Sequence, residues 1–461
     1  MRHLGDAVSP SILHPPDDRA IGPAADGDPG IIILIKQAYN GNSPSGMIVG
    51  IPRNFADFAS PEEVISGIIC VLWFTSSQRS FFSAFHKPSS RSSVKLPVIN
   101  VALCVVLLFL SRSVLAQEHD AATTGQPRQK KIHRWWDERN PGESFNSPLS
   151  RKLPLISVRG KRFVDPDGNV VLFRGLSISD PDKIESQGHW NRQLFSRVKE
   201  MGSHLVRIPV HPVAWRERTP EHYLALLDSA VEWCTELGMY VIIDWHSIGN
   251  LKSGLFQDPM YNTSTAETFA FWRTIARHFR GHNTAAFYEL FNEPTLYFNQ
   301  LGRMSWDEWK KINEDLISVI RAFDGEKIPL VAGFDWAYDL TPLRINPVEA
   351  ERIGYVTHPY PHKRTQPWEP KWEEDFGFAA DQFPVIATEI GFTNGKEGMA
   401  ENGAYGKAIV GYLEGRGISW VAWVFDPEWT PSMMNSWNTY TLTGSGQFFK
   451  GAMQAKPHGS E

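Results

Sequence analysis

From about Leu153 onward, short apolar segments alternate with longer segments of helical periodicity, and this repetition limits the folds open to the chain. Eight apolar segments have the length and composition of buried strands. They span residues 171–178, 204–210, 240–246, 285–291, 328–334, 353–360, 383–392 and 418–425. Eight strands alternating with helices over about 300 residues predict an α/β fold, a closed parallel (β/α)8 TIM barrel. The competing fold, an open doubly wound sheet, would need a glycine-rich phosphate loop after the first strand, and "FRGLSISD" is not one.

Residues typical of helix ends and turns support this division into strands and helices. Pro220 at a first helical position, with Thr219 before it as a cap and Gly238 after it, predicts a helix between the second and third strands. Ser305 and Glu308 predict a capping box for a later helix. Ahead of the barrel, "FVDPDGNVV" (163–171) predicts a short β-hairpin that turns at Asp-Gly. We therefore expect one catalytic domain over residues 153–456.

The N-terminal part of the chain has a different character. Residues 1–93 show no sustained period, and we predict that they are disordered or not translated. In "VKLPVINVALCVVLLFLSRSVLAQ", Lys95 precedes an apolar run and small residues, which predicts a signal peptide over 94–116 with cleavage after Ala116. A translation start near Val94 would explain a secretory signal so far along the chain; an internal anchor helix is the alternative, although the run is short for one. The polar segment 117–152 is predicted to be a linker, and the protein to be secreted or periplasmic.

Composition excludes several functional classes. Only Cys234 follows the predicted signal, so no intramolecular disulfide and no Cys/His zinc site are expected. The net charge of −5 is mild, so we expect no nucleic-acid partner. We also expect a monomer without stable membrane association once the signal is cleaved. The 17 tryptophans exceed what a core needs, and platforms for flat, apolar ligand faces are one explanation beside ordinary burial.

Polar or ionisable residues stand where the apolar segments stop. They are Arg207, His246, Asn292, Glu293, His358, Tyr360, Glu389 and Trp423. In a parallel barrel, the carboxyl ends of all strands open into one shared mouth. We therefore expect these side chains to lie together rather than at unrelated surface positions.

Two of these residues, Glu293 and Glu389, suggest a chemistry. Glycoside cleavage needs one carboxylic acid that protonates the leaving oxygen and one carboxylate on the opposite face of the sugar. Their surroundings must differ, so that one stays protonated and the other ionised. No cofactor is expected, and His246 and His358 are not expected to bind a metal because no third ligand stands at a suitable spacing.

The motifs resemble glycoside hydrolase family 5, the cellulase family of the barrel glycosidase clan A, from about Leu153 to Phe449. "ELFNEP" resembles its acid/base motif and "ATEIGF" its nucleophile strand. The resemblance implies that Glu293 is the acid/base and Glu389 the nucleophile of a retaining double displacement, with their carboxyl groups about 5–5.5 Å apart. Tyr360 should donate a hydrogen bond to Glu389, and Arg207 should keep Glu389 ionised.

The remaining residues of the set are expected to bind substrate. Asn292 should bond the sugar 2-hydroxyl, His246 and His358 should contact hydroxyls or the acid/base, and Trp423 should form the floor under the sugar. Trp336 is a further candidate for stacking on a sugar face, and weaker candidates are Trp215, Trp245, Trp429 and Trp437. Glu289, two residues deeper than the apparent strand end, is expected to pair with Arg174 or Arg207.

The leading interpretation is a secreted, retaining endo-β-glycosidase that hydrolyses β-1,4-glucan, a cellulase or endoglucanase with a polysaccharide as its partner. Mannan, xyloglucan or another β-glucan remain alternatives, since the residues at the cleavage point would be shared, and endo or exo action stays open. A barrel that binds carbohydrate without catalysis is less favoured, because both glutamates are present. A metal-dependent hydrolase or a phosphate-binding isomerase would need ligand motifs that the sequence does not show.

Overall fold

The structure, a computed structural model, describes residues 134–137, 153–393 and 403–456. The predicted disordered segment 1–93, the predicted signal peptide 94–116 and most of the predicted linker 117–152 lie outside the described residues, so these remain predictions. Among the residues described, no helix has both the length and the apolar character needed to cross a membrane.

Eight parallel strands close into a barrel, as predicted. In chain order they are β3 (Arg174–Ser177), β4 (Leu205–Val210), β5 (Tyr240–Trp245), β8 (Ala285–Glu289), β10 (Ile328–Ala332), β11 (Gly354–Val356), β12 (Val385–Ile390) and β13 (Ser419–Ala422). Each strand pairs with the next, and β13 pairs with β3 to close the ring. Each strand lies within a predicted apolar segment but is shorter, because the ends of those segments form loops.

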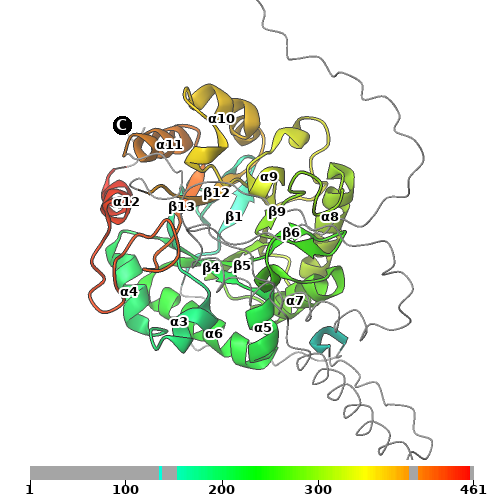
Figure 1. Ribbon diagram of the computed structural model, residues 1–461, viewed down its shortest axis with the longest axis horizontal. Coiled ribbons are helices and arrows are strands. Elements are labelled where there is room, and N and C mark those ends of the chain that lie inside the picture. Colours follow the sequence, from blue (N-terminus) through cyan, green and yellow to red (C-terminus); the bar gives the residue numbers. More distant parts are fainter. Residues whose placement is uncertain (1–133, 138–152, 394–402, 457–461) are drawn as a thin grey trace, which may run out of the picture. The chain divides into compact units, whose positions relative to one another are not determined.

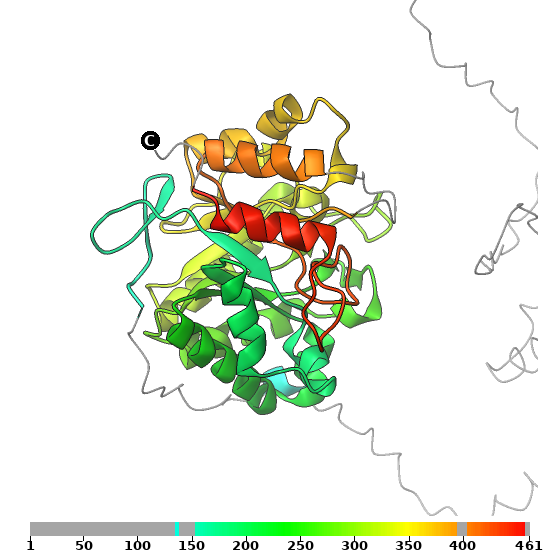
Figure 2. The same ribbon diagram turned by 90° about the vertical axis from the view of Figure 1, so that its left-hand side faces the viewer.

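Helices surround the barrel in a ring, and Figure 1 looks into it. The longer helices are α4 (Arg192–Glu200), α6 (Pro220–Leu237), α7 (Thr265–His278), α8 (Trp306–Phe323), α11 (Gly403–Gly415) and α12 (Gly444–Gln454). The shorter ones are α3 (Pro181–Ser186), α5 (Pro212–Arg218), α9 (Phe334–Ala337) and α10 (Glu369–Asp375), with 3-10 turns η2 (Trp135–Asp137), η3 (Pro259–Tyr261), η4 (Thr341–Arg344), η5 (Pro361–Lys363) and η6 (Gly377–Asp381). Figure 2 shows α11 and α12 side by side, in orange and red.

The helix signals were mostly accurate. The capping box of Ser305 and Glu308 is formed in full. Helix α6 begins at Pro220 and ends before Gly238, whose φ of 69° suits glycine. Thr219 was wrong as a side-chain cap: it makes no such bond, because its φ of 71° serves the tight junction at which α5 ends and α6 begins.

The predicted hairpin over residues 163–171 is present but short: an antiparallel bridge joins Val164 to Val170, and the amides of Asp165 and Val171 donate to the carbonyls of Asn169 and Phe163 at 3.0 and 2.9 Å. A longer ladder, which the sequence pattern did not predict, forms just before it between β1 (Ser157–Arg159) and β2 (Arg162–Val164). Phe163 belongs to both hairpins and packs into the barrel floor, with its ring centroid 5.2 Å from that of Phe287.

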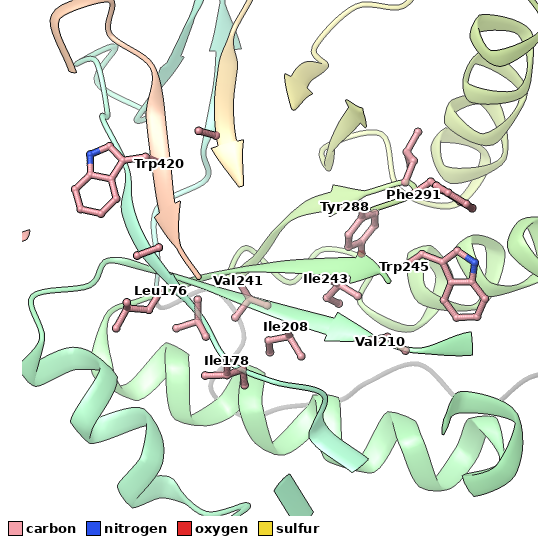
Figure 3. Close-up of a cluster of buried hydrophobic side chains, with 14 of the residues drawn as sticks. Leu176, Ile178, Ile208, Val210, Val241, Ile243, Trp245, Tyr288, Phe291 and Trp420 are labelled. Carbon is pink, nitrogen blue, oxygen red and sulfur yellow. The ribbon is translucent and has the colours of Figure 1, made fainter. Parts of the chain in front are cut away.

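Two apolar cores follow from the two faces of the strands. The larger lies between strands and helices, where Figure 3 shows side chains such as Leu176, Ile208 and Val241. The smaller fills the lower barrel interior with residues such as Leu205, Ile242 and Phe287. Side chains two positions apart share a strand face. The residue two positions after Leu205, Ile242 or Phe287 therefore also points into the barrel, one layer closer to the mouth.

Candidate active site

The upper layer of the barrel interior is polar where the lower layer is apolar. Two residues after an apolar interior position on β4, β5, β8 and β12 come Arg207, Asp244, Glu289 and Thr388. All four are buried, with no measurable exposure. The same two-residue step past Val356 of β11 reaches His358, and past Val421 of β13 it reaches Trp423. Strand periodicity therefore stacks a polar layer directly on the barrel core.

Glu293 reaches the mouth by a different route from the one predicted. Strand β8 ends at Glu289, and Glu293 belongs to a separate two-residue strand, β9 (Glu293–Pro294). Strand β9 pairs with β6 (Ile248–Asn250), which also pairs with β7 (Leu255–Phe256) in a small three-stranded sheet. The amide of Glu293 donates to the carbonyl of Ser247 at 3.1 Å. The loop after β5, rather than the barrel wall, thus sets the position of this carboxylate.

Glu389 lies on β12, where an irregularity between Ala387 and Ile390 shifts the register against β13. The irregularity lets two successive side chains, Thr388 and Glu389, face polar interior partners. The predicted hydrogen bond from Tyr360 is present, at 2.7 Å to Oε2 of Glu389. Nη1 of Arg207 donates to the other oxygen, Oε1, at 2.8 Å.

Arg207 is the centre of this network. Nε and Nη2 hold both oxygens of Glu289, at 2.7 and 3.0 Å, which confirms one of the two predicted partners. The other candidate, Arg174, pairs with Glu414 at the opposite end of β3. Nη2 of Arg207 also lies 2.6 Å from Oδ1 of Asn292 and 2.9 Å from Oδ2 of Asp244.

His358 connects the carboxylates on the other side. Nδ1 lies 2.9 Å from Oε1 of Glu293 and 3.9 Å from Oε2 of Glu389, and Nε2 lies 2.9 Å from the hydroxyl of Thr388. Burial alone would lower the pKa of His358, but Glu389, Glu289 and Glu293 raise it to about 9. The ring therefore carries a proton at neutral pH and is a cation between acidic groups.

Opposing effects act on the pKa of Glu389. Burial raises the pKa of Glu389, and this effect outweighs the opposing effects of His358 and Arg207. Arg207 acts in the predicted direction, but Glu389 is only 5% exposed, and the effect of removal from water is the largest. For Arg207 itself, burial would lower the pKa, while Asp244, Glu289 and Glu389 raise it well above its usual value.

Glu293, His358 and Glu389 each offer one polar atom within 4.8 Å of the others. The spacing argument that denied His358 further metal ligands was therefore unsound, since the fold recruits them from other strands. A cation here would have to displace the proton that His358 shares with Glu293 and compete with Arg207 for Glu389. The existing charges favour the hydrogen-bonded arrangement.

The predicted substrate contacts line the same mouth. Nδ2 of Asn292 is buried without a hydrogen-bond partner in the described part of the chain, so it is free to donate to a ligand. The rings of His246 and Trp423 stack at 7° with centroids 5.5 Å apart. Trp429 is nearly parallel to both rings, with its centroid 5.7 Å from that of Trp423 at 21° and 6.5 Å from that of His246 at 16°. Parallel rings of this kind offer an apolar face to a sugar.

The remaining tryptophan candidates are Trp215, Trp245, Trp336 and Trp437, and Trp437 is buried with its ring stacked on that of His189 at 5.2 Å. Trp215 and Trp245 are fully buried in the outer core, so they cannot stack on a ligand. Trp336 is half-buried at the rim, with Nε1 bonded to Gln257 at 2.7 Å and Nζ of Lys363 lying 4.7 Å from its ring centroid. Trp336 makes no hydrogen bond to the group around Arg207, and the ammonium group of Lys363 lies over one face of its ring. Its role in stacking on a sugar stays a prediction.

Sequence reasoning missed Asp244 and Thr388. Asp244 precedes His246 by two positions, and its Oδ2 lies 2.6 Å from Nδ1 of that ring. The two-residue period on β5 could have identified it, because both side chains had to share the interior face. Thr388 had no such signal, since its neighbour Glu389 was already expected to point inward.

The chain is similar to known proteins of one family in sequence and in fold. The family model described as Cellulase (glycosyl hydrolase family 5) matches residues 164–428. Endoglucanase E-5 of Thermobifida fusca is 26% identical over 320 residues, which cover 65% of this chain and 64% of that protein. Endoglucanase A of Butyrivibrio fibrisolvens is 29% identical over 216 residues, which cover 44% of this chain and 45% of that protein. The match thus spans less than two thirds of the length of each of these relatives.

A solved structure matches over a larger share of its own length. The β-glucanase SdGluc5_26A of Saccharophagus degradans, crystallised with cellotetraose, is 43% identical and superimposes with a TM-score of 0.67. The alignment covers 70% of this chain and 98% of that one. The native form of the same enzyme is 44% identical, with a TM-score of 0.66.

Proposed function

Because this chain belongs to the cellulase family, glycosyl hydrolase family 5, we propose that it is an endo-acting β-glucanase that cleaves β-1,4-glucan with retention of configuration. One observation carries the proposal. Glu293 and Glu389 come from different sheets, and an oxygen of each lies within 4.8 Å of the other, with His358 between them. Retaining glycosidases hold their carboxyl groups about 5–5.5 Å apart, whereas inverting ones need about 6.5–9.5 Å for a water molecule.

Glu389 is the nucleophile in this mechanism. Its carboxylate attacks the anomeric carbon as the bond to the glycosidic oxygen breaks, which forms a glycosyl-enzyme ester. Hydrogen bonds from Arg207 and Tyr360, one to each oxygen, hold the carboxylate in one orientation. Arg207 is itself fixed by Glu289, so the nucleophile is positioned through a rigid ion pair.

Glu293 supplies the proton that the departing oxygen needs, and it then removes a proton from the water that cleaves the ester. His358 supports the second of these states, because its Nδ1 bonds the carboxyl group at 2.9 Å and its positive charge favours the anion once the proton has left. Esterification of Glu389 removes a negative charge across the cleft, which favours Glu293 as the base of the second step.

The substrate class is argued from the mouth of the barrel. Trp423, Trp429 and His246 present parallel rings, and Asn292 has a free amide donor beside the carboxylates. A cellotetraose complex is described for the S. degradans β-glucanase, which is 43% identical. This likeness favours β-glucan over mannan or xyloglucan as the polysaccharide.

We also propose that the protein is exported, which rests on the signal-like sequence 94–116. N-terminal sequencing of the protein recovered from the medium or periplasm tests this proposal. Sequencing should give Gln117 as the first residue. A chain that keeps residues 94–116 would contradict it.

The activity is tested with a panel of soluble polysaccharides, namely carboxymethyl cellulose, mixed-linkage β-glucan, mannan and xyloglucan. We expect a rapid fall in viscosity on the first two, because an endo-acting enzyme cuts within chains. Proton NMR during cleavage of a cello-oligosaccharide should show the β-anomer first, as retention requires. Cleavage of none of the four by folded protein would contradict the function, and initial release of the α-anomer would contradict the mechanism.

A further inference from the structure

His211 is a buried residue beside the proposed active site that neither the sequence patterns nor the family resemblance singled out. It directly follows β4 and is 3% exposed. Its ring centroid lies 4.8 Å from that of His246, 5.4 Å from Trp429 and 5.6 Å from Tyr261. The imidazole therefore belongs to the same wall of aromatic rings that the proposed function assigns to substrate.

Asp180 fixes the orientation and tautomer of this ring. Oδ2 of Asp180 lies 2.8 Å from the backbone nitrogen of His211 and 2.9 Å from its Nδ1. Oδ1 accepts from the hydroxyl of Tyr223 at 2.8 Å and from the amide of Asp182 at 2.7 Å. Because the carboxyl group of Asp180 accepts from its other partners, we assign Nδ1 of His211 as a further donor to it. The remaining nitrogen, Nε2, is then an acceptor in the neutral ring.

The arrangement repeats that of the neighbouring His246, whose Nδ1 lies 2.6 Å from Oδ2 of Asp244. In both rings, Nε2 has no hydrogen-bond partner in the part of the chain that the structure describes. His358 differs, since it uses one nitrogen on Glu293 and the other on Thr388. Two adjacent imidazoles, each held through Nδ1 by an aspartate and each with an Nε2 that no described residue bonds, leave two nitrogens available to a ligand.

We infer that His211 is a substrate-positioning residue, whose Nε2 binds a hydroxyl of the glucosyl unit lying over Trp423 and Trp429. The inference rests on the proposed function, because a β-glucan supplies both the hydroxyl and the flat apolar ring face. His211 makes no hydrogen bond to Glu293 or Glu389 in the described structure, and it takes no part in making or breaking bonds. It adds a second imidazole contact on the side of the cleft that carries His246.

Two substitutions separate this role from a purely structural one. In His211→Asn, the amide can still donate to Asp180 from near the position of Nδ1, but the reach of Nε2 is lost. In His211→Gln, a longer amide reaches the position of Nε2, while the bond to Asp180 is lost. We expect His211→Asn to lower kcat/KM on cellotetraose about tenfold with an unchanged unfolding midpoint, and His211→Gln to recover most of the activity.

Binding is measured separately, as the calorimetric Kd for cellotetraose in a Glu389→Gln background, where it should rise about tenfold for His211→Asn. His278→Asn is the matched control, because His278 also pairs with an aspartate, Asp228, at 2.6 Å, but at the opposite end of the barrel. It should leave kcat/KM unchanged. The inference would be overturned if His211→Asn kept the kcat/KM and Kd of the wild type, or if His211→Gln lost more kcat/KM than His211→Asn. Either result would leave the proposed function standing. A protein that neither cleaves nor binds cellotetraose would overturn the proposed function, and the inference with it.

Discussion

At the scale of single residues, Arg207 shows how one side chain organises a site. Its guanidinium bonds Glu289, Glu389, Asn292 and Asp244 from a position with no exposure to solvent. Only a planar group with several fixed donors can satisfy four such partners, and lysine could not. The orientation of the proposed nucleophile thus depends on an ion pair deeper in the barrel.

We predict that Glu293→Ala will show a loss that depends on the leaving group. An alkoxide leaving group needs the proton, so kcat/KM on cello-oligosaccharides should fall about 10²- to 10⁴-fold. An aryl cellobioside with an acidic phenol leaves unaided, so its kcat/KM should fall far less. Equal losses on both substrates, measured under the same conditions, would remove Glu293 from the acid/base role.

Glu389→Gly provides the complementary test. Turnover should disappear, because no carboxylate remains to form the ester. Added azide fits the vacated space and should restore cleavage of an activated aryl glycoside, releasing an α-glycosyl azide that NMR identifies. A β-linked azide, or full activity without azide, would argue against the assignment.

His358 makes stability depend on pH with a definite sign. Its pKa in the folded protein, about 9, lies above the ordinary value of 6.5, so the ring stabilises the fold fully below about pH 6.5. This contribution, about 3 kcal/mol, should be lost as pH rises through 9. Denaturant unfolding of wild type and His358→Gln from pH 6 to 9.5 should show the difference between them shrinking. Lys327, whose pKa burial lowers to about 8, titrates in the opposite sense and cancels in that difference. A constant difference would contradict the assignment.

At the scale of elements, the small sheet β7-β6-β9 is the support of Glu293. Gly249 in β6 pairs with Pro294 and has a φ of 154°. A Cβ there would lie 2.7 Å from the carbonyl oxygen of Leu255 and 2.7 Å from Cα of Phe256. Any larger residue must therefore push β6 and β7 apart and move the strand that carries the carboxylate.

We predict that Gly249→Ala will lower kcat/KM about 10²-fold, because displacement of a catalytic group by about 1 Å has that effect. Gly254→Ala in the same loop is the control. Gly254 also has a positive φ, 71°, but no atom lies within 4 Å of an added Cβ. It should cost stability of about 1 kcal/mol through backbone strain and leave activity near wild type. Equal activity of the two variants would show that β6 does not position Glu293.

At the scale of the whole molecule, one described segment of the predicted linker is attached to the barrel. In η2, Nε1 of Trp135 donates to Oε1 of Glu267 at 2.9 Å, and its ring lies 5.7 Å from that of Trp215. Glu267 is buried and also bonds Arg216 at 2.8 Å. The catalytic domain therefore draws on contacts from before residue 153, where the sequence pattern suggested that it begins.

We predict that Trp135→Ala will lower the free energy of unfolding by about 2 kcal/mol, through lost apolar burial and a lost hydrogen bond to a buried carboxylate. A chain that begins at residue 153 should lose at least as much. Trp136→Ala is the control, since its ring contacts Trp135 and no other described ring. Denaturant unfolding measures all three, and equal stability of the Trp135 and Trp136 variants would refute the anchoring role.

The sequence by itself determined the order and type of the barrel elements, and it singled out the two glutamates that we propose for catalysis. Strand and helix periods are local properties of a chain, so the eight strands, the capping box at Ser305 and the end of α6 at Gly238 could be predicted. The same period placed Arg207 and His246 on the inner face. On a strand, the side chain two positions away points to the same face, so this assignment needs no tertiary structure.

Only the tertiary structure decided how these residues meet. The register shift in β12 turns Glu389 inward, the pairing of β9 with β6 places Glu293, and Asp180 orients His211 from 31 positions away. Each depends on contacts between segments distant in sequence, which form only when the barrel closes. Burial likewise set the pKa of Glu389 against the pull of Arg207, because desolvation is a property of the folded interior and not of a neighbouring residue in the chain.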